Sequence, residues 1–337
     1  MKHLAGTTLL LVALSMDGRY AQSTGDSLPN PYRLPTLSWG QLPDGRKWGA
    51  VAGASFDSKG YLWVFERCGG ISCAGSDVAP IVELDPSSGK VLKSFGAGLF
   101  VCPHAIYVDK KDKDSIWVVD QLAKDGKGEQ VWKFSPEGKL LMVLGKPGVS
   151  GNNPDTFNDP TDVVIGQNGD IFVADGHRGT TQTMARIVKF SKNGKFLMSW
   201  GKKGSQPGDL DDPHSIAIDS QGRLFVADRG NVRIDIFDQD GKLLGAWKQF
   251  GIPSGIFVDD KDILYVAENF LRPEAPDFKR GIRIGDAREG KVTAFIEDPD
   301  QDPKDGNIGP ENVTADKLGS LYAGEVDRRM IKKYVLQ

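Results

Sequence analysis

The sequence is poor in histidine and cysteine and carries little excess charge of either sign. Its 42 basic and 45 acidic residues leave a formal net charge of −3, so it offers no basic surface for nucleic acid. After the first residues, no apolar run is long enough to cross a membrane. We therefore expect neither a nucleic-acid partner nor an internal membrane span.

The N-terminus has the pattern of a secretory signal peptide. A short positive start precedes an apolar run from Leu4 to Met16, and small residues follow at Ala21–Ser23. The run is too short to span a bilayer comfortably, although an uncleaved anchor is the alternative. We predict a cleaved signal over residues 1–23. A single domain over residues 24–337 would then be secreted or periplasmic and free of the membrane.

Three cysteines are present, and two of them are close in sequence. In an exported chain Cys68 and Cys73 could close a small disulfide loop. Cys102 is then left over, and a buried thiol is the commonest fate of a lone cysteine. A thiolate metal ligand is the less favoured alternative for Cys102.

The chain is rich in glycine and repeats one short phrase six times. Segments such as GDIFVADG and GRLFVADR alternate apolar residues in the manner of a strand and close on an acid. The period is 40 to 57 residues, and we find no strong helical periodicity between copies. Six copies of about four short strands predict an all-β fold, a six-bladed β-propeller. The acids that close the copies are Glu66, Asp120, Asp175, Asp228, Glu268 and Glu325.

A second position recurs fourteen or sixteen residues before each acid, and proline precedes it in five copies. This position holds, in order, Ala52, His104, Thr161, His214, Ser254 and Glu311. We expect these residues to form a ring at the mouth of the central channel. His104, His214 and Glu311 come from alternate blades, so they would converge on the axis. Two imidazoles and one carboxylate with open positions predict a catalytic metal site.

Three further residues are expected at the same end of the channel. His177 follows the acid of the third blade closely, and a neutral imidazole there could act as a general base. Arg67 and Arg229 each follow an acid directly, in blades that face each other. Their guanidinium groups could hold a carboxylate or carbonyl of a substrate. The alternatives are an exposed loop histidine and ordinary salt bridges between blades.

Residues 45–337 resemble the catalytic propeller of peptidyl-α-hydroxyglycine α-amidating lyase, which is built from NHL repeats. The resemblance is carried by LFVCPHAIYVD, PGDLDDPHSIAID and VADRGNVRI, with the two Pro-His pairs as the most specific features. It implies a six-bladed NHL propeller and cleavage of a carbinolamide C–N bond to give an amide and glyoxylate.

The resemblance also implies site roles. It places zinc on His104 and His214, and substrate binding on Arg67 and Arg229. It places a structural calcium at the backbone carbonyls of Val51 and Ile106.

The sequence departs from the family at four positions of the implied site. Glu311 stands where the family has its third zinc histidine, and Asn312 replaces the acidic calcium ligand that follows. His177 takes the place of the active-site tyrosine, and Gly309 that of a methionine. Glutamate is also a zinc ligand, and the asparagine oxygen remains a possible calcium ligand.

We expect a monomeric, metal-dependent lyase whose small-molecule or peptide substrate carries a carboxylate or carbonyl. Zinc is the implied ion, and a site of two histidines and a glutamate also accepts iron or manganese. A metal-dependent hydrolase such as a lactonase is the second hypothesis, favoured by the Glu311–Asn312 pair. A non-catalytic binding propeller is the third.

Overall fold

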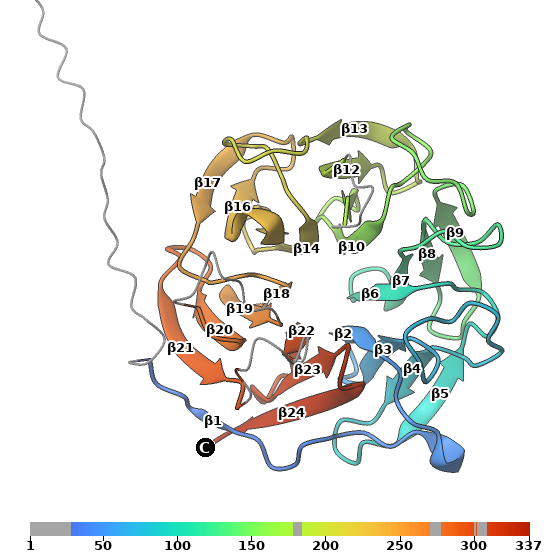
Figure 1. Ribbon diagram of the computed structural model, residues 1–337, viewed down its shortest axis with the longest axis vertical. Helices are drawn as coiled ribbons and strands as arrows, with labels where there is room; N and C mark the ends of the chain where they lie inside the picture. Colours follow the sequence, from blue (N-terminus) through green and yellow to red (C-terminus); the bar gives the residue numbers. More distant parts are fainter. Residues whose placement is uncertain (1–27, 178–183, 270–277, 300, 302–308) are drawn as a thin grey trace, which may run out of the picture.

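The computed structural model describes residues 28–177, 184–269, 278–299, 301 and 309–337. Its strands form six four-stranded antiparallel sheets arranged around a central axis (Figure 1). The predicted all-β, six-bladed β-propeller is therefore confirmed. The proposed signal peptide over residues 1–23 and its boundary with the domain lie outside the described residues.

Each blade runs from an innermost strand at the channel to an outermost strand at the rim. Blade one contains β2 (Val51–Phe56), β3 (Leu62–Glu66), β4 (Ile81–Leu84) and β5 (Val91–Phe95). Blade two contains β6 (Pro103–Asp109), β7 (Ser115–Asp120), β8 (Gln130–Phe134) and β9 (Leu140–Leu144). Blade three contains β10 (Pro160–Ile165), β11 (Ile171–Asp175), β12 (Arg186–Phe190) and β13 (Phe196–Trp200).

The second half of the chain continues the same pattern. Blade four contains β14 (Pro213–Ile218), β15 (Leu224–Asp228), β16 (Arg233–Phe237) and β17 (Leu243–Trp247). Blade five contains β18 (Gly255–Val258), β19 (Ile263–Glu268), β20 (Gly281–Asp286) and β21 (Val292–Glu297). Blade six contains β22 (Pro310–Ala315), β23 (Leu321–Glu325), β24 (Met330–Leu336) and β1 (Tyr32–Arg33). Two short 3₁₀ turns, η2 (Pro43–Gly45) and η3 (Arg229–Asn231), complete the elements.

The ring of blades is closed by the two ends of the domain. Strand β1 pairs with β24 and so supplies the outermost strand of blade six. The backbone N–H of Trp39 also donates to the carbonyl of Ile331, which extends this attachment. Each sheet keeps two short edge strands, one along the channel and one at the rim.

The hydrophobic core is divided among the interfaces between blades. The six clusters of buried apolar residues in the described part each span two neighbouring blades, for example Trp117 and Val173 in one cluster and Phe172 and Val226 in another. The second strand of a blade is buried on both faces, which explains its nearly continuous apolar sequence. Packing blade against blade therefore fixes the geometry of the channel.

The recurring acids are structural anchors. The carboxylate of Asp120 accepts hydrogen bonds from the backbone N–H groups of Val101 and Cys102, which lead into β6. Asp228 accepts from the N–H of Asp211 in the same way before β14. Asp120 and Asp228 therefore tie the ends of β7 and β15 to the loops that enter β6 and β14, next to the ring position.

The cysteines behave as expected from the sequence. Cys68 and Cys73 form a disulfide in the loop that follows β3. Cys102 is a buried thiol whose pKa is raised by burial, and it donates to the side-chain oxygen of Gln121. Among the described residues, no helix is long and apolar enough to cross a membrane.

Candidate metal centre

The ring residues are aimed into the channel by β-bulges. Strand pairing shifts register between Pro103 and Ala105, so His104 has no partner on β7. A shift between Pro213 and Ile216 releases His214 in the same way. A third lies between Pro310 and Asn312, on either side of Glu311. Because a bulge re-aims the unpaired side chain, these residues can turn toward the axis.

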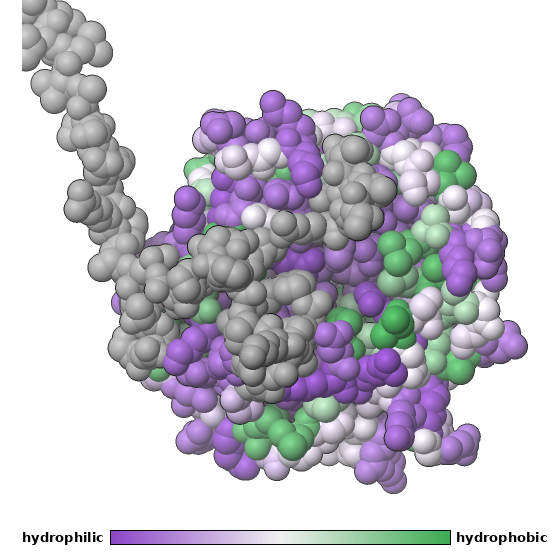
Figure 2. Space-filling view, in the orientation of Figure 1, coloured by the Kyte–Doolittle hydropathy of each residue, from purple (hydrophilic) through white to green (hydrophobic). Residues whose placement is uncertain are grey.

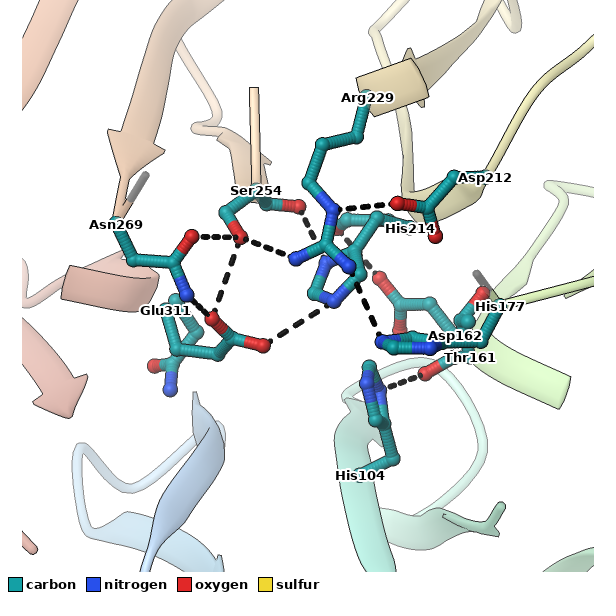
Figure 3. A network of polar contacts seen from close by, with 12 residues as sticks. His104, Thr161, Asp162, His177, Asp212, His214, Arg229, Ser254, Asn269 and Glu311 are labelled. Atoms are coloured by element: carbon teal, nitrogen blue, oxygen red, sulfur yellow. Dashed lines mark hydrogen bonds and ion pairs between the residues drawn. The ribbon is translucent and has the colours of Figure 1, made fainter. Parts of the chain in front are cut away.

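His104 and His214 are held in the same manner. The Nδ1 atom of His104 lies 2.7 Å from the carbonyl oxygen of Thr161, and that of His214 lies 2.9 Å from the carbonyl oxygen of Ser254 (Figure 3). A carbonyl only accepts, so each Nδ1 carries a proton and donates it, which fixes the direction of each imidazole ring. The Nε2 of His104 is buried without a hydrogen-bond partner among the described residues. This is the arrangement of a metal-binding imidazole.

Glu311 is a buried carboxylate beside these imidazoles. One oxygen, Oε1, lies 3.1 Å from Nε2 of His214. The other accepts a hydrogen bond from the side-chain amide of Asn269, and the hydroxyl oxygen of Ser254 lies 3.3 Å from it. Burial raises the pKa of Glu311, but His214 and Arg229 outweigh burial and hold it below its usual range. Glu311 is therefore ionised at neutral pH.

The three histidines also lie close together. One ligand atom from each of His104, His177 and His214 falls within 4.8 Å of the others. Burial and the neighbouring charges lower the pKa of His104 well below its usual range, so it is neutral. Neutral imidazoles and an ionised carboxylate are the forms that bind a divalent transition metal. The residues present therefore fit a metal ion, with His104 and His214 central and Glu311 and His177 on either side.

Arg229 connects two parts of this centre. From η3, its Nε donates to Asp212 at 2.7 Å, and Nη1 donates to the hydroxyl of Ser254 at 3.2 Å. Its Nη2 lies 3.1 Å from Nε2 of His177, which must accept because a guanidinium only donates. Burial and this positive charge hold the pKa of His177 at about 3. His177 is therefore a neutral imidazole whose Nε2 faces Arg229.

Arg67 lies on the opposite side and is less constrained. Its Nε donates to the carbonyl of Pro103 at 2.9 Å, directly before His104. Its side chain is partly exposed, and no ion pair ties its guanidinium among the described residues. The Cys68–Cys73 disulfide starts at the next residue and restrains this loop. Arg67 can therefore turn toward a ligand at the channel mouth.

The residues expected to bind calcium lie one layer deeper. The side-chain amide of Asn312 donates to the carbonyl of Val51 at 3.3 Å. The Oδ1 atom of Asn312 is buried and has no partner among the described residues. Ile106 lines the same channel from β6, and no hydrogen bond joins it to Val51 or Asn312 in the described part. The structure thus brings Val51 and Asn312 together, with Ile106 on the neighbouring inner strand.

The channel is large enough for a small molecule. A cavity of about 770 Å³ follows the axis from the ring residues toward the opposite end of the inner strands. The face in Figure 2 is mostly hydrophilic, with small apolar areas beside its centre. His104, His214 and Glu311 line this cavity, whereas Arg67, His177 and Arg229 are not among its lining residues.

Three polar residues of the site were missed by the sequence reasoning. Asp212 and Asn269 contact Arg229 and Glu311, and Asp162 accepts from the hydroxyl of Ser215 in the channel wall. Asp212 directly precedes the second Pro-His pair, and Asn269 directly follows a repeat acid. Their positions in the repeat could have marked them as site residues. Their contacts could not be predicted, because their partners lie in other blades or loops.

Comparison with known proteins agrees with this architecture. The NHL repeat model matches residues 210–237, which contain the second Pro-His pair and Arg229. Human NHL repeat-containing protein 3 is 34% identical over 242 residues, covering 69% of this chain and 66% of the human protein. Peptidyl-glycine alpha-amidating monooxygenase A of Xenopus laevis is 37% identical over 216 residues. A probable peptidyl-alpha-hydroxyglycine alpha-amidating lyase of Caenorhabditis elegans is 31% identical over 206 residues.

The chain is an NHL-repeat propeller homologous to the hydroxyglycine amidating lyases. The match to the frog protein covers 57% of this chain and 22% of the frog protein. The match to the worm protein covers 56% of this chain and 55% of the worm protein. A gluconolactonase from Xanthomonas campestris superposes with a TM-score of 0.59 over 92% of this chain and 96% of the lactonase, at 16% identity. That likeness shows the shared propeller fold.

Proposed function

We propose that this NHL propeller is a secreted, metal-dependent lyase that cleaves the C–N bond of an N-acyl-α-hydroxyglycine. The observation that carries the proposal is the convergence of two imidazole Nε2 atoms on the channel axis beside an ionised Glu311. Arg229 and Arg67 flank this centre and supply positive charge for a carboxylate. Homology to the amidating lyases supports the same reaction class.

A divalent metal held by His104, His214 and Glu311 would supply a Lewis acid that polarises the substrate hydroxyl. Arg229 and Arg67 bind the substrate carboxylate and orient the carbinol carbon. The carboxylate draws the Nη2 of Arg229 away from His177 and raises the pKa of that imidazole. The freed Nε2 of His177 can then act as a base.

The reaction balances without a further reactant. His177 removes the hydroxyl proton as the C–N bond breaks and the carbinol carbon becomes the aldehyde of glyoxylate. The same proton passes from His177 to the departing amide nitrogen. The products are a primary amide and glyoxylate, in equal amounts.

The donor atoms indicate which ions the two layers suit. Two imidazoles and one carboxylate are ligands of zinc, and iron and manganese accept the same set. The unpartnered oxygen of Asn312 beside the carbonyl of Val51 fits an oxygen-preferring ion such as calcium. All three deeper ligands (Val51, Ile106 and Asn312) are neutral, so we expect weak calcium binding.

Glu311→Gln tests the lyase proposal. The amide is a poorer ligand than the carboxylate, so we expect metal affinity and turnover to fall together, each by at least about tenfold. Metal content by elemental analysis and glyoxylate release from an N-acyl-α-hydroxyglycine measure both. Glu325→Gln, at a buried repeat acid of the same blade, is the matched control and leaves both unchanged. A fully active, metal-replete Glu311→Gln variant would contradict the ligand role.

A metal-dependent lactonase is the second candidate. It is favoured by the carboxylate of Glu311 and the amide oxygen of Asn312, two neighbouring residues that both line the channel. Hydrolysis of lactones by the metal-loaded protein, without glyoxylate release from hydroxyglycine derivatives, would select this function.

A further inference from the structure

The three ring ligands are held by two opposite kinds of contact. The imidazoles of His104 and His214 each donate a proton to a backbone carbonyl. The carboxylate of Glu311 can only accept, and the amide of Asn269 donates to it, with the hydroxyl of Ser254 at a longer 3.3 Å. The surroundings of each ligand thus match its hydrogen-bonding chemistry.

The orientation of Asn269 follows from its neighbours. Nη1 of Arg229 donates to Oγ of Ser254, and the Ser254 hydroxyl lies 2.9 Å from Oδ1 of Asn269. The hydroxyl has one proton and can give it to this amide oxygen. The NH₂ group of Asn269 consequently faces Glu311. Asn269 is 1% exposed, so water does not substitute for this contact.

Gly309 provides the space that Asn269 occupies. A Cβ atom at position 309 would lie 2.9 Å from Cα of Asn269 and 2.6 Å from the carbonyl oxygen of Glu268. Any side chain at position 309 would therefore displace the backbone of Asn269.

We infer that Asn269 is a positioning residue that holds the carboxylate of Glu311 for metal binding. It acts through Glu311 and has no role as a reacting group. Loss of its N–H leaves one carboxylate oxygen with only the longer Ser254 contact, so the carboxylate is less well held against the metal. This inference rests on the proposed metal function of Glu311.

Asn269→Asp provides the direct test, with cobalt(II) as the probe. The new carboxylate repels Glu311 and cannot donate, so we expect cobalt affinity to fall about 10- to 100-fold, as for other outer contacts of metal ligands. Chelator competition gives the affinity, and the cobalt absorption spectrum reports the altered coordination. Asn269→Ala removes the donor without adding charge and should change both readouts in the same direction.

A double-substitution cycle separates this role from a general packing effect. In a Glu311→His background, the new imidazole would donate to a backbone carbonyl, as His104 and His214 do. Asn269→Asp should then change cobalt affinity by less than about threefold. Asn168→Asp is the matched control, because it removes an amide donor from the Asp170 carboxylate in the turn between β10 and β11, outside the ring. We expect it to leave cobalt affinity unchanged, and thermal unfolding of each metal-free protein checks folding.

The outcomes distinguish this inference from the proposed function. Tight cobalt binding that is weakened by Asn269→Asp only in the Glu311 background supports both. Two outcomes overturn the role of Asn269 but leave the metal centre supported. In one, cobalt binds tightly and neither Asn269 substitution weakens it. In the other, Asn269→Asp weakens binding equally in the Glu311 and Glu311→His backgrounds. No cobalt binding by the folded wild-type protein overturns both.

Discussion

Replacing Arg229 with alanine is expected to destabilise the protein by about 3–5 kcal/mol, because it leaves the buried Asp212 carboxylate without its guanidinium partner. It should also lower kcat/KM about 10- to 100-fold through loss of a charged hydrogen-bond donor to substrate. Urea unfolding and initial rates measure the two effects. Arg229→Lys keeps the charge and should recover part of the stability and less of the activity, because a lysine lacks the planar fork.

The stability difference should depend on pH in a defined direction. Burial raises the pKa of Asp212, but Arg229 outweighs burial and holds it below its usual range. The stabilisation from ionised Asp212 is therefore present above its unfolded pKa of about 3.9 and is lost as pH falls through its lower folded pKa. In Arg229→Ala, the buried Asp212 carboxylate has lost its guanidinium partner, so its protonation at low pH removes the cost of burying that charge. The difference in the free energy of unfolding between wild type and variant should shrink below about pH 4. A constant difference down to pH 3 would contradict this account.

Joint replacement of His104 and His214 with alanine is expected to abolish binding of the transition metal. Two of the three proposed ligands are removed, so affinity should fall by more than the roughly 10- to 100-fold typical of outer contacts. Turnover should fall with the metal content. Chelator competition and elemental analysis of purified protein measure the loss.

Gln121→Ala is a suitable control for the histidine pair. Gln121 is a buried polar residue of blade two that contacts Cys102 and lies outside the ring. Its substitution should leave metal content intact. A His104→Ala/His214→Ala variant that retains one equivalent of tightly bound metal would show that the ion lies elsewhere.

The sequence was sufficient to predict the propeller because each blade corresponds to one copy of a sequence repeat. The strand phrase and its acid recur in every blade, and Asp120 and Asp228 prove to anchor the loops before β6 and β14. The ring position could be predicted because His104 and His214 share one place in that repeat.

The contacts around the ring could not be predicted in the same way. The bulges that release His104 and Glu311 depend on strand register, which the alternating pattern alone does not reveal. The contact between Asn269 and Glu311 joins two blades across a gap of 42 residues. Such pairs become visible only when the blades are packed around the axis.

The most direct test of the metal centre is a crystal structure of the metal-loaded protein with anomalous scattering from the bound ion. We predict one ion about 2.0–2.2 Å from Nε2 of His104, Nε2 of His214 and an oxygen of Glu311, with Asn269 still donating to the other oxygen. His177 should remain outside the coordination sphere. An ion bound by the three histidines with Glu311 turned away, or no ion at the ring, would contradict the account.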